Sequence, residues 1–204
     1  MIRVSEANEP PDFGALVRTP GQDYLLSLAS LEDAEVAKRP YWRRALKQLH
    51  AGYGGICAYT CHWIPYDVGS DTVEHFLPKS IYPELAYEWS NYRLVCGRLN
   101  GRKGDWQDVV DPFDVIDGMF CLEFPSLLLV VGQNLSPAQR MMAVSTINRL
   151  KLNEARSIDM RLHFVRNLLD GHVSKQYVSQ HAPFLSREMD RQAIDSARLS
   201  ELFG

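Results

Sequence analysis

The sequence has no strong excess of charge of either sign. Its 204 residues include 22 Lys and Arg against 25 Asp and Glu, a formal net charge of −3. This balance excludes a protein that binds polyanions through its overall charge, because such binding needs a basic surface. Any contact with nucleic acid must therefore come from local clusters of basic residues.

Long apolar runs are also missing. The most apolar segment, residues 127–131, is far shorter than the roughly 20 residues that a membrane-spanning helix needs. Residues 1–6 lack the apolar stretch of a signal peptide. We therefore expect a cytoplasmic protein that makes no contact with a membrane.

Cysteine is scarce, with four residues in the whole chain. So few cysteines in a chain of this length do not predict a disulfide scaffold. Hydrophobic residues make up 46% of the sequence and charged residues 23%, as in an ordinary globular protein. The fold must therefore depend on a hydrophobic core.

Local signals predict an α+β fold in one mostly α-helical domain. Three consecutive segments are expected: an N-terminal arm with a helical part (1–55), a polar central region (56–110), and a hairpin with C-terminal helices (111–204). Residues 1–30 show little periodicity and predict an irregular arm. A helix is then expected from residue 31, capped by Ser30 and interrupted at Pro40.

In the central region, β-branched and aromatic residues predict short strands over residues 56–63, 73–76 and 92–96. A short helix is expected to begin after Gly97 and to end at Gly104. The region thus predicts strands and one helix around a polar centre.

The last third of the chain predicts a hairpin, residues 119–124 with 127–131. Apolar spacing predicts a buried face for the helix that follows, made of Met141, Val144, Ile147, Leu150 and Leu152. Helices are expected at three places: from Ser136, over 154–169 and over 186–202.

Residues 38–47 contain five basic residues and no acidic one. One interpretation is a solvated helix surface with Trp42 and Leu46 turned inward. The other is a surface that contacts phosphate groups. The sequence favours neither.

The polar residues of the central region form an ordered set. Glu74 and His75 lie in a predicted strand, Asn91 precedes the next strand, and Asn100 and Lys103 share one face of the short helix. Carboxylate and carboxamide oxygens are ligands that suit Mg²⁺, and a neutral imidazole accepts a proton near neutral pH. The set suits hydrolysis of a phosphodiester, which needs an activated water and a Lewis acid.

Three short motifs carry a resemblance to a known family. Val73-Glu74-His75, Trp89-Ser90-Asn91 and Asn100-Gly101-Arg102-Lys103-Gly104 resemble the HNH nuclease motif of the ββα-metal (His-Me finger) superfamily. The resemblance implies a ββα-metal finger, two short strands plus a helix, over residues 56–110. It also implies a metal-dependent endonuclease.

The resemblance assigns a role to each residue of the set. Glu74 and Asn100 would hold one Mg²⁺ or Mn²⁺ ion. His75 would be the general base, and Asn91 would hold the loop that orients it. Lys103 matches a basic position after the second ligand and is expected to stabilise charge on the phosphate.

Two arginines of the same short helix, Arg98 and Arg102, are expected to bind phosphate. The alternative is that they only keep the surface soluble. Their position next to the motif favours phosphate.

A narrower resemblance rests on further segments. Gly55-Ile56-Cys57-Ala58-Tyr59, Glu74-His75-Phe76-Leu77-Pro78-Lys79-Ser80 and Ile147-Asn148-Arg149-Leu150-Lys151-Leu152-Asn153 are similar to HNH subunits of Septu-type and retron-associated anti-phage systems. Those subunits act with an ATPase partner. The resemblance therefore implies a DNA-cleaving effector of antiviral defence; RNA cleavage and a non-catalytic binding module are the alternatives.

Such proteins often frame the finger with two Cys-x-x-Cys pairs that bind a structural zinc. Here the first pair is spread over Cys57-Ala58-Tyr59-Thr60-Cys61, and the second retains only Cys96. The three thiolates, with His62 as a fourth ligand, could form a tetrahedral zinc site. Alternatively, Cys57 and Cys96 are small buried residues.

Overall fold

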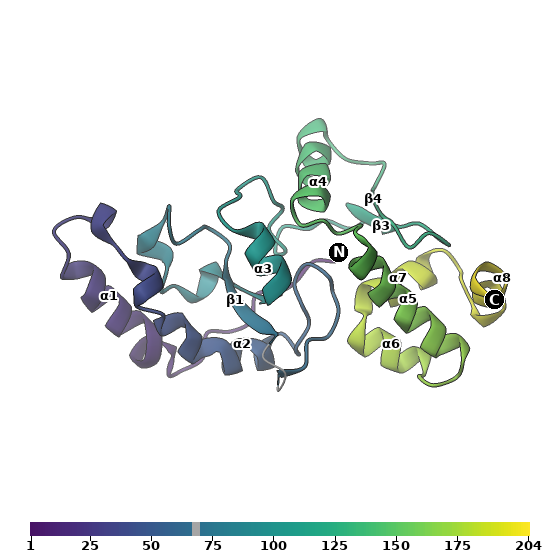
Figure 1. Ribbon diagram of the computed structural model, residues 1–204, viewed down its shortest axis with the longest axis horizontal. Helices are drawn as coiled ribbons and strands as arrows, with labels where there is room; N and C mark the ends of the chain where they lie inside the picture. Colours follow the sequence, from purple (N-terminus) through teal and green to yellow (C-terminus); the bar gives the residue numbers. More distant parts are fainter. Residues whose placement is uncertain (67–69) are drawn as a thin grey trace. The chain divides into compact units, whose positions relative to one another are not determined.

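The computed structural model describes residues 1–66 and 70–204 (Figure 1). These residues form two compact units, which do not follow the three predicted segments. The N-terminal unit comprises Ser5–Cys57 and Ile64–Gln107, and the C-terminal unit comprises Met1–Val4, Ala58–Trp63 and Asp108–Gly204. Most of the predicted arm and most of the predicted central region thus share one unit.

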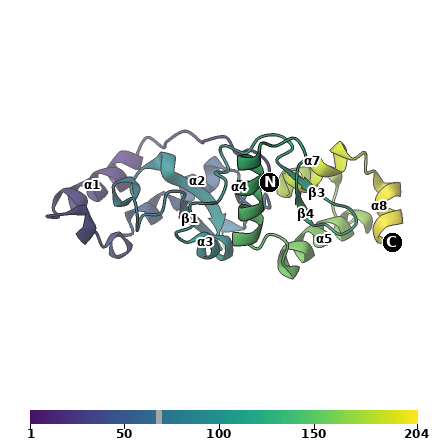
Figure 2. The same ribbon diagram turned by 90° about the horizontal axis from the view of Figure 1, so that it is seen from above.

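Helices and two small antiparallel sheets make up the structure, which confirms the α+β class. The N-terminal unit contains α1 (Thr19–Leu26), α2 (Leu46–Gly52), β1 (Asp71–His75), β2 (Tyr92–Cys96) and α3 (Gly97–Lys103). In β1 and β2, Asp71 lies opposite Cys96 and His75 opposite Tyr92. Both α2 and α3 contact β1 (Figure 2).

The predictions for the central region are mostly confirmed. Strand β2 and helix α3 lie where the sequence places them, and Gly104 ends α3 with a φ of 44°. Residues 56–63 were expected to form a strand, and this prediction is wrong. Cys61 has a φ of 55°, a left-handed conformation that interrupts an extended segment.

The N-terminal arm is more regular than its sequence suggests. Instead of an irregular chain, it contains a π-helical turn, Gly14–Arg18, that leads into α1. Tertiary packing explains the difference: Phe13 is buried against the Trp89 ring at 5.4 Å. Gly21 of α1 lies so close to Tyr87 that a Cβ atom there would overlap the ring.

The helix expected from residue 31 is replaced by three short 3₁₀ helices before α2. They are Leu31–Asp33, Val36–Lys38 and Tyr41–Ala45. The predicted cap is confirmed, because the Ser30 hydroxyl accepts a hydrogen bond from the Glu32 amide at 3.2 Å. Only Val36 is buried in the first two helices, so no apolar face stabilises a longer α-helix.

The C-terminal unit contains the predicted hairpin and a group of helices. Its elements are β3 (Phe120–Leu122), β4 (Leu129–Val131), α4 (Pro137–Arg149), α5 (Ala155–Leu169), α6 (Lys175–His181), α7 (Pro183–Arg191) and α8 (Ser196–Phe203). The start of α4 is confirmed: Ser136 and Gln139 form a reciprocal capping box. Across the described residues, no helix has both the length and the apolar character needed to cross a membrane.

Two predictions for this unit are wrong. Met141 and Val144 are 67% and 43% exposed, while Ala143 and Thr146 of the same helix are buried. The expected helix over 186–202 is split into α7 and α8, because the chain takes a left-handed conformation between them at Ala193. Helix α6 was not predicted.

Glu188 on α7 ties the helix to the hairpin of the same unit. Its side chain is buried, its Oε2 accepts a hydrogen bond from the Leu122 amide at 2.8 Å, and Arg191 donates to the same oxygen at 2.7 Å. Burial opposes ionisation, but these hydrogen bonds outweigh it and hold the pKa of Glu188 below its usual value. The carboxylate is therefore charged at neutral pH and accepts hydrogen bonds from both the Leu122 amide and Arg191.

We predict that Glu188→Ala lowers the free energy of unfolding by about 3 kcal/mol, because it leaves the Leu122 amide without its acceptor. Urea denaturation followed by circular dichroism measures this. Glu201→Ala is the control, since it breaks only the exposed ion pair with Arg198 and should cost less than about 0.5 kcal/mol. Equal losses in both variants would contradict the prediction.

Candidate functional site

A pocket of about 460 Å³ lies in the N-terminal unit, next to β1. Its walls come from the 3₁₀ helix Tyr41–Ala45, from β1 and the turn after it, and from α3. The pocket brings together three of the predicted site residues, Glu74, His75 and Asn100.

His75 is buried and held by a hydrogen bond. Its Nε2 lies 2.9 Å from the carbonyl oxygen of Ala86. A carbonyl can only accept, so Nε2 carries the proton and Nδ1 of the neutral ring has a free lone pair. The ring also meets Trp42 edge-on, with centroids 5.0 Å apart.

The electrostatic surroundings keep this imidazole neutral. Burial lowers the pKa of His75 to about 3, and the charges of Lys79 and Lys103 act in the same direction, against the hydrogen bond to Ala86. At neutral pH, His75 is therefore uncharged in the ligand-free protein, with Nδ1 unprotonated.

Glu74 is buried on the side of β1 that faces α3. Its Oε1 lies 3.1 Å from the Lys103 ammonium, and neither side chain is more than 3% exposed. Burial raises the pKa of Glu74 to about 7, although the Lys103 charge acts in the opposite direction. The carboxyl group is thus poorly compensated, and a further cation would stabilise its charged form.

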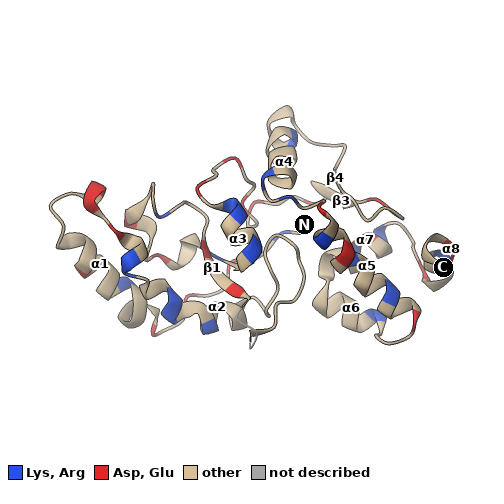
Figure 3. Ribbon diagram, viewed as in Figure 1, with Lys and Arg blue, Asp and Glu red and all other residues tan. Residues whose placement is uncertain are grey.

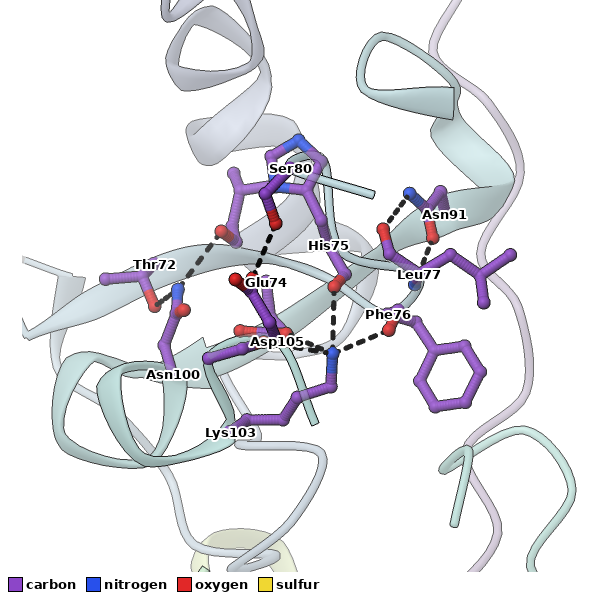
Figure 4. A network of polar contacts seen from close by, with 12 residues as sticks. Thr72, Glu74, His75, Phe76, Leu77, Ser80, Asn91, Asn100, Lys103 and Asp105 are labelled. Atoms are coloured by element: carbon purple, nitrogen blue, oxygen red, sulfur yellow. Dashed lines mark hydrogen bonds and ion pairs between the residues drawn. The ribbon is translucent and has the colours of Figure 1, made fainter. Parts of the chain in front are cut away.

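Lys103 is directed toward the backbone (Figure 4). Its ammonium donates to the carbonyl oxygens of Phe76 at 2.6 Å and His75 at 3.2 Å, in addition to the contact with Glu74. These contacts use the three donors of the group. In this structure Lys103 supports the end of β1 and the Glu74 carboxylate, which is a different task from the expected contact with phosphate.

Asn91 fixes the loop that follows β1. Its Oδ1 accepts from the Leu77 amide at 2.8 Å, and its Nδ2 donates to the carbonyls of Leu77 at 3.0 Å and Leu85 at 3.1 Å (Figure 4). Leu85 precedes Ala86, whose carbonyl holds His75. Asn91 thus holds the segment whose carbonyl binds His75, and its role in orienting a catalytic base stays a prediction.

Asn100 presents one end of its side chain for a ligand. Its Nδ2 donates to the Thr72 hydroxyl at 2.9 Å and to the Val73 carbonyl at 3.1 Å. The Val73 carbonyl can only accept, so the group that faces it must be the NH₂ of the Asn100 amide. The other group, the Oδ1 oxygen, is then on the opposite side of the amide. Glu74 and Asn100 thus contribute a carboxylate and an amide oxygen to one pocket.

Sequence reasoning missed several residues that line the pocket. Asp71 is 5% exposed, and within the described residues its Oδ2 is buried without a hydrogen-bond donor. Asp105 accepts a hydrogen bond from Ser80 at 2.7 Å. No local pattern marks these residues, because only the fold brings them to β1.

The basic residues of the segment 38–47 are exposed and Trp42 is buried, as the solvated-surface interpretation expects, although Leu46 is only half-buried. Figure 3 marks the Lys and Arg positions along the chain. Arg43 lines the pocket, together with Lys79. Arg44 instead donates to the Leu16 carbonyl at 3.0 Å, and Arg39 lies over the Tyr24 ring. The segment thus gives one cation to the pocket and uses others to hold the N-terminal region.

Arg98 and Arg102 lie on α3 and are partly exposed. Neither is among the residues that line the pocket. Phosphate binding by these two arginines stays a prediction.

The three cysteines proposed for zinc belong to different units. Cys57 and Cys96 lie in the N-terminal unit, where the Cys96 amide approaches the Cys57 sulfur at 3.5 Å, and Cys61 lies in the other. The hydrogen bond to Cys57 and burial raise the pKa of the Cys96 thiol, whereas zinc binds thiolates. In the described part of the chain, no three His, Cys, Asp or Glu residues gather as a metal site. A structural zinc stays a prediction.

Comparison with known proteins gives one partial match. The chain is 34% identical over 74 residues to the Septu protein PtuB of Bacillus thuringiensis. The match covers 36% of this chain and 28% of that protein. No family model matches the chain. The similarity agrees with the expected likeness to Septu-type proteins over that part of the sequence.

We predict that Lys103→Met lowers the free energy of unfolding by about 3 kcal/mol. The variant leaves the carbonyls of His75 and Phe76 without a donor and Glu74 without its partner. Urea denaturation measures the loss. The exposed Lys47 of α2 provides the control, and Lys47→Met should change stability by less than about 0.5 kcal/mol. A Lys103→Met protein as stable as this control would show that the buried contacts do not matter.

We also predict that Glu74 makes the metal-free protein less stable as pH rises. Its pKa is raised from 4.5 to about 7, so the folded state keeps a proton that the unfolded chain has lost. This contribution is full below pH 4.5 and is lost as pH rises through 7. Gln does not titrate, so Glu74→Gln should gain stability relative to the wild type across this range. Urea unfolding of both proteins in the presence of a chelator, at a series of pH values, tests this. The prediction would be contradicted if the stability of Glu74→Gln minus that of the wild type stayed constant or decreased as pH rises.

Proposed function

We propose that this protein is a metal-dependent endonuclease of the HNH type that hydrolyses phosphodiester bonds in DNA. The observation that carries the proposal is that Glu74, His75 and Asn100 line one pocket. The pocket is lined by β1 and α3. Strand β1 pairs antiparallel with β2, which leads into α3, and two strands followed by a helix is the order of elements in a ββα-metal finger.

The residues present suit one hard divalent cation. Glu74 offers a buried carboxylate, whose pKa is raised by that burial, and Asn100 offers an amide oxygen. Two oxygen ligands leave positions for water and for the substrate, as Mg²⁺ and Mn²⁺ require. Such an ion would act as a Lewis acid that withdraws charge from the phosphate.

His75 would activate the attacking water. Nε2 is occupied by the Ala86 carbonyl, so Nδ1 would accept the proton of the water. The water oxygen would attack phosphorus as the bond from phosphorus to the leaving oxygen of the nucleic acid breaks, and that oxygen would take up a proton from solvent. Asn91 holds the loop that carries this carbonyl, and Lys103 holds the strand end that carries His75. Both act as positioning residues in this proposal.

The partial similarity to the Septu protein PtuB supports a role in anti-phage defence. We propose that the protein is the nuclease subunit of such a defence complex and acts with an ATPase partner. The net charge of −3 agrees with this view, because a partner that holds the DNA removes the need for a basic nuclease surface.

Cleavage of supercoiled plasmid in Mg²⁺ or Mn²⁺ tests the proposal. The wild type should nick the plasmid, a chelator should abolish nicking, and His75→Ala should reduce the rate by at least about a hundredfold. His163→Ala is the control, because His163 is exposed on α5, contacts Asn167 and Phe164 of the same helix and does not line the pocket.

Thermal unfolding must first show that the variants are folded, with His75→Gln as a second variant. Nicking that survives in folded His75 variants would contradict the assignment of the base. If the wild type cleaves a structured RNA and leaves plasmid intact, the substrate is RNA. Inactivity on both nucleic acids, alone and with the partner, would contradict the enzyme.

A further inference from the structure

The pocket has charges of both signs, contributed by different elements. Asp71 and Glu74 come from β1, and Asp105 follows α3. The two cations are Arg43, from the 3₁₀ helix before α2, and Lys79, from the turn after β1. The carboxylates attract a metal ion, whereas the cations attract an anion.

Lys79 is available for an anion. Its ammonium lies 5.5 Å from the centre of the Trp42 ring, a cation–π contact that uses none of its N–H donors. Within the described residues, it forms no hydrogen bond or ion pair. The indole thus holds the ammonium at the pocket while its three donors stay available.

The position of Lys79 relative to His75 follows from the shared Trp42. The indole contacts the His75 ring edge-on at 5.0 Å and carries the Lys79 ammonium at its face. Lys79, His75 and Glu74 all line the same pocket. The ammonium is therefore placed in the pocket that holds both residues.

We propose that Lys79 binds a phosphate oxygen of the nucleic-acid backbone and so positions the phosphodiester between His75 and the Glu74–Asn100 metal site. Arg43, exposed at the rim of the same pocket, would bind a neighbouring phosphate. The inference rests on the proposed function, and it adds a substrate-binding residue to it. The phosphate and the pocket carboxylates are both negatively charged. The Lys79 ammonium would reduce the repulsion between them when the substrate binds.

The competing explanation is an ordinary solvated lysine that happens to rest on a tryptophan. The two differ in how binding depends on salt. Each phosphate that a protein cation neutralises releases counterions and adds about 0.9 to the slope of log K against log salt concentration. Loss of a true phosphate contact must therefore change the slope as well as the affinity.

The test measures binding of a fluorescently labelled DNA duplex by anisotropy, with Mg²⁺, in a His75→Ala background that prevents turnover. Lys79→Gln should weaken binding about five- to tenfold and lower the salt slope by about 0.9. Lys79→Arg keeps the charge and should bind within about twofold of the parent. Lys38→Gln is the control, because Lys38 is exposed and already paired with Glu35.

The inference would be overturned if the Lys79→Gln variant bound the duplex and an RNA hairpin with the same affinity and the same salt slope as the His75→Ala parent. It would also be overturned by a parent that binds neither the duplex nor the RNA hairpin at low salt. If Lys79→Gln weakened binding of the RNA hairpin and left binding of the DNA duplex unchanged, the result would support phosphate binding by Lys79 with RNA as the substrate. Cleavage of plasmid and of RNA by the wild type, alone and with the partner, is measured separately. Lys79-dependent binding without any such cleavage would contradict the nuclease and leave the phosphate site supported.

Discussion

The ammonium of Lys103 is buried, and a buried charge is stable only where hydrogen bonds and an opposite charge replace its water. The carbonyls of His75 and Phe76 and the carboxylate of Glu74 provide that replacement. These contacts join α3 to the end of β1, so they fix where Asn100 stands relative to Glu74. The pocket and its polar groups depend on this arrangement.

At the end of β1, the adjacent residues Glu74 and His75 lie in different surroundings. Glu74 faces α3 and its lysine, while His75 packs against the rings of Trp42 and Tyr92. Alternation along a strand sends neighbouring side chains to opposite faces, so the carboxylate and the imidazole acquire different surroundings. Burial then raises the pKa of Glu74 and lowers that of His75, because it opposes the charged form of each group.

Much of the central region could be predicted because its signals are local. Strand β2 follows from β-branched and aromatic residues, α3 from its flanking glycines, and the start of α4 from Ser136 before a proline. The 3₁₀ helices before α2 and the arm that leads into α1 could not be predicted. Their form depends on contacts such as that of Phe13 with Trp89, which lie far apart in the chain.

The sequence by itself determined the order and identity of the polar residues, from Glu74 and His75 to Asn100, because a motif is a property of neighbours and spacings. Only the tertiary structure decided what each side chain faces. It turned Lys103 toward backbone carbonyls and brought Lys79 onto the Trp42 ring beside the pocket. The reason is that a side chain's direction and burial are set by the segments packed around it, which no local spacing specifies.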